Sequence, residues 1–124
     1  MSHEAKEVKV ALEALRRSIQ WKPGKDLTHL EKRKRRGHLS KEFSLEDLNR
    51  LIQNLIHQDT SKIYLYRFGE NRYYIVRGEI EKKEWFIISS KEGIIETVFP
   101  PRNAERYLSR RGVALLGEMR EVVK

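Results

Sequence analysis

His29 is the residue of this sequence best placed for proton transfer, because a dense run of cations follows it. The run begins three positions later and reads Lys32-Arg33-Lys34-Arg35-Arg36. The spacing of Thr28 and Glu31 is that of a capping box, which predicts a helix that starts at Thr28 with His29 in its first turn. The cations and the helix dipole both disfavour an imidazolium, so we expect a neutral ring that acts as a general base near pH 7. The alternative is a partly buried polar histidine without a chemical role.

The basic run is itself a candidate binding surface. Five cations on a short helix cannot all be buried, so we expect residues 32–36 to contact phosphates. Such runs also occur as localisation signals or disordered arms. His38 follows the run and is a candidate for RNA contact and for a second acid or base role. His57 ends an apolar helix and is expected to be a structural partner of the helix dipole.

A second group of candidates lies about 70 residues further along the chain. The strand that ends in Pro100-Pro101 is expected to alternate, with Ile95, Thr97 and Phe99 on one face. Thr97 would then place a hydroxyl on that face, although a threonine in a strand most often serves the sheet alone. Beyond the prolines a stripe of cations recurs every four residues, with Tyr107 beside it: Arg102, Arg106 and Arg110. The alternative for this stripe is a solvated helix face paired with Glu105.

These residue types favour one kind of chemistry. The sequence has no cysteine, no paired-carboxylate cluster, no Gly-rich phosphate loop and no His/Cys ligand spacing. A protein of this composition that cleaves nucleic acid is expected to need neither a metal nor another cofactor. RNA is then the substrate, because its 2′-hydroxyl is a built-in nucleophile. A base takes the proton, cations stabilise the phosphorane, and an acid or hydroxyl assists the leaving 5′-oxygen.

The elements that would position these groups follow from periodicity and turn residues. Helices, strands and a last helix are expected in this order: residues 4–20, 28–36 and 44–56, then 63–68, 72–79, 84–89 and 94–99, then 103–111. Ser44 and Asn103 are the predicted N-caps of two of the helices, and Gly112 ends the last one. The order predicts an α+β fold in which N-terminal helices pack on a four-stranded antiparallel β-meander, followed by a C-terminal helix.

The length predicts one domain. Residues 1–124 would form it, with an N-terminal helix in 1–22, a core in 26–111, and a further helix or a tail in 112–124. The 26 Lys and Arg against 18 Asp and Glu give a formal charge of +8, which favours a polyanionic partner. A charge-rich surface of a heat-tolerant protein is the alternative. With no cysteine, no long apolar stretch and no signal-like start, we expect a cytoplasmic protein that does not enter a membrane.

The same residues resemble a known group of proteins. His29-Leu30-Glu31-Lys32-Arg33, the capped helix, the aromatic strands and Gly93-Ile94-Ile95-Glu96-Thr97-Val98-Phe99-Pro100-Pro101 look like the bacterial ribonuclease-toxin superfamily typified by barnase, EndoU, the tRNA-cleaving colicins and RelE. The resemblance covers about residues 28–111. It implies a toxin-type ribonuclease in which His29 is base or acid and Arg33 holds the scissile phosphate. Thr97 would orient that phosphate, and Tyr107 would stack on a base or assist protonation.

Three functional hypotheses remain open at this point. The first is a metal-independent endoribonuclease that acts on tRNA, mRNA or ribosomal RNA and is held in check by an acidic antitoxin protein. The second is a non-catalytic module that binds RNA or the ribosome and stacks bases on tyrosines of neighbouring strands: Tyr64, Tyr66, Tyr73 and Tyr74. Packing of the same rings in the core is the alternative and the commoner use. The third is a protein-interaction domain whose charge is incidental.

Overall fold

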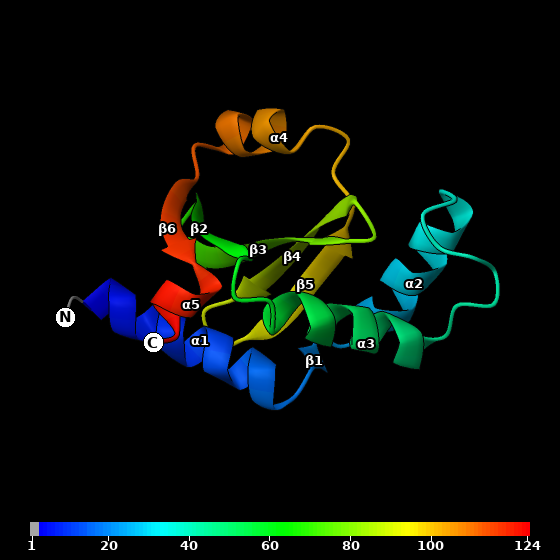
Figure 1. The fold of residues 1–124 in the computed structure, drawn as a ribbon, viewed down its shortest axis with the longest axis horizontal. Coiled ribbons are helices and arrows are strands. Elements are labelled where there is room, and N and C mark those ends of the chain that lie inside the picture. Colours follow the sequence, from blue (N-terminus) through cyan, green and yellow to red (C-terminus); the bar gives the residue numbers. More distant parts are fainter. Residues whose placement is uncertain (1–2) are drawn as a thin grey trace.

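A six-stranded mixed sheet forms the centre of the molecule, with helices on both of its faces (Figure 1). The structure is a computed structural model that describes residues 3–124, without the side chains of the first two of these. The expectation that no signal segment begins the chain rests in part on Met1 and Ser2, which lie outside the described residues. No helix in the described part of the chain is long and apolar enough to cross a membrane.

The helices and strands have the following bounds. The helices are α1 (His3–Arg17), α2 (Lys25–Arg35), α3 (Leu45–Ile56), α4 (Ala104–Arg111) and α5 (Met119–Val122). The strands are β1 (Gln20–Trp21), β2 (Lys62–Phe68), β3 (Asn71–Ile80), β4 (Lys83–Ser90), β5 (Ile94–Phe99) and β6 (Ala114–Glu118). The order across the sheet is β1-β5-β4-β3-β2-β6.

The predicted α+β class is confirmed, but the sheet is larger than a four-stranded meander. β2, β3, β4 and β5 form the expected antiparallel meander. β1 adds a parallel strand at one edge, and β6 adds an antiparallel strand at the other. β1 has only two residues, so it shows no alternation that a sequence pattern could detect. Residues 112–124, expected as a helix or tail, supply β6 and the short α5, because the apolar run at 114–116 pairs with β2 far away in sequence.

The start of α2 differs from the prediction in a way that moves His29. The turn at Pro23-Gly24 closes through a hydrogen bond from the Lys25 amide to the Lys22 carbonyl, and the helix begins at Lys25. Thr28 is therefore not the N-cap, and its hydroxyl donates to the Gly24 carbonyl 2.8 Å away. His29 lies in the second turn of α2, so the dipole argument for its neutral ring was wrong. The predicted caps at Ser44 and Asn103 and the left-handed Gly112 after α4 are confirmed.

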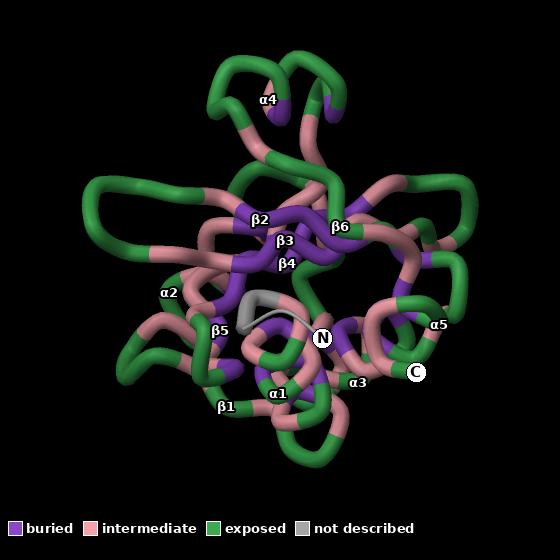
Figure 2. The backbone as a smooth tube through the Cα atoms, turned by 90° about the vertical axis from the view of Figure 1, so that its left-hand side faces the viewer, coloured by how far each residue is buried: buried purple, intermediate pink, exposed green. Residues whose placement is uncertain are grey.

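The sheet buries a hydrophobic cluster on each face. The larger cluster joins the sheet to α1, α2, α3 and α5, and Leu12, Ile52 and Ile87 are fully buried in it. The smaller cluster lies under α4 and contains Phe86, Ile88 and Leu108. Figure 2 shows the buried strands as a layer between α4 and the other helices. The face that packs against α1, α2, α3 and α5 thus carries the main hydrophobic core, while α4 covers only part of the other face.

Candidate functional site

A cleft of about 860 Å³ opens between the end of α2, the end of β5 and α4. We call it the arginine cleft, after its lining residues: Arg33, Arg36, His38, Phe99, Pro100, Pro101, Arg102, Asn103, Arg106, Tyr107, Arg110 and Arg111. Among the described residues no aspartate or glutamate lines it. The double proline ends β5, and the Asn103 side chain caps α4 by accepting from the Arg106 amide at 3.1 Å. The double proline and the Asn103 cap thus set the start of α4, whose arginines line the cleft together with those of α2.

Arg33 is the most unusual residue of the cleft, because its guanidinium is buried without a carboxylate partner. The residue is only 3 % exposed. Its Nη1 donates to His38 Nδ1 at 3.2 Å, and its Nε has no hydrogen-bond partner. No ion pair to it forms among the described side chains, those of residues 5–124. Burial, and then the charge of Arg36, lowers its pKa. A buried charge of this kind is strongly destabilising unless an anion reaches it.

His38 is held against Arg33 by the turn that ends α2. Gly37 takes a left-handed φ of 73°, and the His38 amide then donates to the Arg33 carbonyl at 2.9 Å. Because a guanidinium can only donate, His38 Nδ1 must be the acceptor, and the proton of the neutral ring is on Nε2. Burial is the main cause that lowers the pKa of His38, and the charges of Arg33 and three further cations add to this effect. His38 therefore offers the cleft an uncharged N–H donor.

His29 and Thr97 contact each other beside the cleft. The Thr97 hydroxyl lies 3.3 Å from His29 Nδ1, and the imidazole stacks on Trp21 with ring centroids 6.1 Å apart. Burial is the main cause that lowers the pKa of His29, followed by the charges of Arg33, Lys25 and Lys32. A hydrogen bond to the Glu96 carbonyl acts in the opposite direction. The half-buried ring is thus biased to the neutral form and oriented by three neighbours.

A β-bulge in β5 explains how Thr97 reaches this position. Ile88 pairs with Thr97 and Ser89 pairs with Ile95, so Glu96 is an extra residue without a partner. The predicted alternation was therefore wrong for Ile95, which lies in the same cluster as Val98. Thr97 pairs with Ile88 of the smaller cluster and so lies on the face of the sheet that carries the cleft.

Tyr107 forms the floor of the cleft. Its ring contacts Phe86 and Phe99, each with centroids 5.3 Å apart, and the Arg111 guanidinium lies over it at 3.5 Å. Burial raises the pKa of Tyr107. Since Arg111 covers a ring face and the two phenylalanines pack against the ring, a base has no room to stack there. The expectation of stacking on Tyr107 is not supported by this geometry, whereas its protonated hydroxyl remains available for hydrogen bonding.

The residues predicted from the sequence thus fall into three sets. The first lines the arginine cleft: Arg33, Arg36, His38, Arg102, Arg106, Tyr107 and Arg110. His29 and Thr97 form the second set at its margin, one helical turn from Arg33. The third set does not line the cleft: Lys32, Lys34 and Arg35.

Arg111 is the cleft residue that the sequence analysis missed. Its spacing of four residues from Tyr107 is a signal that could have identified it, because residues at i and i+4 of a helix contact each other. Among the side chains that the structure describes, those of residues 5–124, no group of three His, Cys, Asp or Glu is arranged to hold a metal ion. Comparisons of the chain with models of protein families, with curated proteins and with solved structures found no match.

Proposed function

We propose that this protein is a toxin-type endoribonuclease that binds the scissile phosphate of RNA in the arginine cleft and cleaves without a metal ion. The observation that carries the proposal is Arg33, a buried guanidinium without a carboxylate, in a cleft whose charged lining residues are all cations. Phosphate is an anion with the geometry and charge to satisfy several guanidinium groups at once. A polymer of phosphates explains why six arginines surround one cleft.

RNA is favoured over DNA because of the chemistry that the site can supply. The neutral His29 would take the proton of the 2′-hydroxyl as its oxygen forms a bond to the adjacent phosphorus. Arg33 and the Nε2–H of His38 would stabilise the phosphorane charge. The bond from phosphorus to the 5′-oxygen then breaks, and that oxygen leaves with a proton from the Tyr107 hydroxyl. The products are a 2′,3′-cyclic phosphate and a 5′-hydroxyl. Solvent returns a proton to Tyr107 and removes the one on His29.

The toxin assignment adds two expectations that rest on the sequence resemblance. The protein would act in the cytoplasm on tRNA, mRNA or ribosomal RNA. An antitoxin would inhibit it by covering the arginine cleft with acidic side chains, since the chain carries a formal charge of +8.

Incubation with total RNA and purified tRNA in excess EDTA tests the proposal. We expect discrete fragments that end in a cyclic phosphate, and loss of cleavage in His29→Ala and Arg33→Met. The matched control is His57→Ala, because His57 is exposed and its Nδ1 contacts only the Gln53 carbonyl of its own helix. Intact RNA with a salt-sensitive gel shift would overturn the enzyme and leave a non-catalytic RNA-binding module. Intact RNA without a shift would overturn both.

A further inference from the structure

Three aromatic side chains form an exposed cluster at one end of the sheet. Tyr66 and Tyr73 pair across β2 and β3 with ring centroids 6.1 Å apart, and Phe68 adds a third ring 6.2 Å from Tyr66. Phe68 is 64 % exposed, and the two tyrosines are half-buried. We call these three residues the aromatic platform. Grouped rings that stay in contact with water are typical of a binding surface rather than of a core.

The platform lies on the same face of the sheet as the arginine cleft. Tyr66 and Tyr73 pack on the smaller hydrophobic cluster, as Phe99 and Tyr107 of the cleft do. Arg110 and Arg111 stand at the end of α4, and β6, which follows them, pairs with β2 through Ala114 and Leu65.

The end of α4 is therefore next to Tyr66, and Figure 1 shows α4 leading directly into β6. Burial raises the pKa of Tyr107, the charge of Arg111 opposes this increase, and the nearby phenol of Tyr66 adds to it. The arginines of the cleft and the rings of the platform thus lie on the same face of the sheet, with the end of α4 between them.

We propose that the aromatic platform stacks unpaired bases of an RNA strand whose phosphates follow the arginine cleft. This inference rests on the proposed function and names its substrate as single-stranded RNA of more than two nucleotides. Aromatic rings beside a cationic groove are the combination that proteins use for single strands, since every base has a π-face and every nucleotide a phosphate. In a duplex the bases stack on one another and would leave the platform unused.

The sheet geometry sets the length of RNA that the platform requires. The cleft starts at β5 and the platform lies on β3 and β2, three strands further at most. Strands in a sheet are about 4.8 Å apart, which gives about 14 Å across the three steps from β5 to β2. The register places Phe99 in one row with Lys62, and Tyr66 lies four residues further along β2, which adds about 13 Å in the strand direction. The two ends of this surface are therefore about 20 Å apart. A dinucleotide held at Arg33 does not span that distance, whereas a longer strand does.

The other tyrosines of β2 and β3 do not serve as stacking residues. Tyr64 is 7 % exposed and its hydroxyl accepts a hydrogen bond from Arg77. Tyr74 is 2 % exposed and its hydroxyl donates to Glu7. The expectation of four stacking tyrosines is therefore reduced to Tyr66 and Tyr73, joined by Phe68.

Binding of a 2′-O-methyl RNA of eight nucleotides tests the platform independently of cleavage, because this probe lacks the nucleophile. We expect the double variant Tyr66→Leu/Tyr73→Leu to bind about five- to a hundredfold more weakly for each stacked base that is lost. Tyr66→Phe/Tyr73→Phe should retain the affinity. Phe68→Ser, at an exposed position where folding is not at risk, should weaken binding in the same direction. Val10→Ala is the matched control, since Val10 is exposed on α1.

A second probe shows whether the effect is stacking. An otherwise identical strand with abasic residues at the positions that reach the platform should bind wild-type protein as weakly as the leucine variant binds the intact strand. The variant should lose nothing further with the abasic strand, because both changes remove one interaction. Equal affinity of wild type and leucine variant for the intact probe would overturn the inference, even if the protein cleaves RNA. Conversely, platform-dependent binding without any cleavage by wild type would overturn the ribonuclease and leave the platform standing.

Discussion

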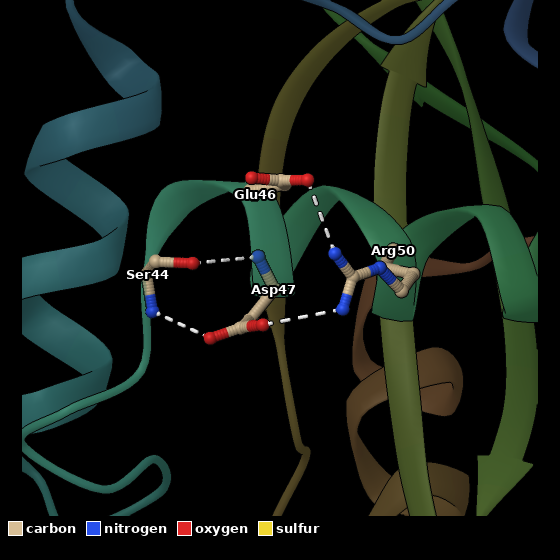
Figure 3. A network of polar contacts seen from close by, with 4 residues as sticks. All are labelled: Ser44, Glu46, Asp47 and Arg50. Atoms are coloured by element: carbon tan, nitrogen blue, oxygen red, sulfur yellow. Dashed lines mark hydrogen bonds and ion pairs between the residues drawn. The ribbon is translucent and has the colours of Figure 1, made fainter.

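The two helices α2 and α3 pack on the same face of the sheet, yet they differ in how their polar groups are satisfied. α3 begins with a complete capping box between Ser44 and Asp47, and Arg50 bridges Glu46 and Asp47 (Figure 3). The N-cap of α2 is Gly24, which has no side chain to cap the helix, and the last turn of α2 carries four cations. One of these cations, Arg33, is buried without a carboxylate.

Under the proposed function, this difference separates α3 as a structural helix from α2 as a helix of the site. The polar groups at the start of α3 partner one another within the helix. In α2 the buried Arg33 has a hydrogen bond to His38 but no carboxylate, and its Nε is without a partner. A buried charge without a carboxylate destabilises the fold, and such a group is expected where a ligand supplies the missing counter-charge. The contrast between the two helices can be tested by changing each of them in turn.

Arg33→Met should have the largest effect, and in opposite directions on activity and stability. We expect RNA cleavage to fall about 10²–10³-fold, because a donor to the developing charge is lost. The free energy of unfolding should rise by about 1–3 kcal/mol, since an apolar side chain of similar length replaces a buried unpaired charge. Urea unfolding and cleavage rates measure the two effects. Arg17→Met, on an exposed position of α1, is the control. A less stable Arg33→Met protein would contradict the interpretation of α2.

The pH dependence of stability should reveal the two histidines that face Arg33. The pKa values of His29 and His38 are lowered in the folded protein from the ordinary value of 6.5. Below that pH the unfolded chain binds protons that the folded protein does not, so stability should fall as the pH drops below about 6.5.

The double variant His29→Gln/His38→Gln should flatten this slope between about pH 5.5 and 7, above the range in which carboxylates titrate. Urea unfolding at a series of pH values measures it. An unchanged slope in the variant would show that neither burial nor the cations around α2 lower the pKa values of these rings in the folded protein.

Ser44→Ala should affect only stability. The Ser44 hydroxyl accepts from the Asp47 amide at 3.0 Å, and its loss should cost about 1 kcal/mol, as for N-caps in general. RNA cleavage should be unchanged below the midpoint of thermal unfolding. A loss of cleavage comparable to that of Arg33→Met, in a Ser44→Ala protein that remains folded, would mean that α3 belongs to the site.

Arg50→Gln should have the smallest effect of the series. The Arg50 side chain is 68 % exposed and forms its ion pairs at the surface of α3, so we expect at most about 0.5 kcal/mol of destabilisation. Since its charge is already balanced by two carboxylates, RNA binding should not change measurably. Arg106→Gln, which removes a cation of the arginine cleft, is the comparison. If Arg50→Gln lost as much RNA affinity as Arg106→Gln, positive charge anywhere on the molecule would suffice for binding.

The sequence was sufficient for features that depend on local signals. Alternation and turn residues identified the four central strands, and the caps at Ser44 and Asn103 followed from side chains that bond to a backbone amide three residues away. Local signals could not identify β6, whose pairing with β2 spans about 50 residues, or β1, which exists only because β5 offers an open edge. For the site, the approach of His29 to Thr97 was expected from the family resemblance and is present. The burial of Arg33 was not predictable, since burial depends on packing that brings α2, β5 and α4 together.

The bulge in β5 means that the sheet could be built from a chain one residue shorter. Ile95 and Thr97 already pair with consecutive residues of β4, so a deletion of Glu96 would leave every other pairing of that strand in register. The inserted residue gives the sheet no additional pairing, yet its carbonyl accepts a hydrogen bond from the ring of His29. We therefore expect a chain without Glu96 to unfold cooperatively as before, while its histidine titrates differently and cleavage declines. Under the proposed function, the extra residue of the bulge therefore contributes to the chemistry of the site rather than to the pairing of the sheet.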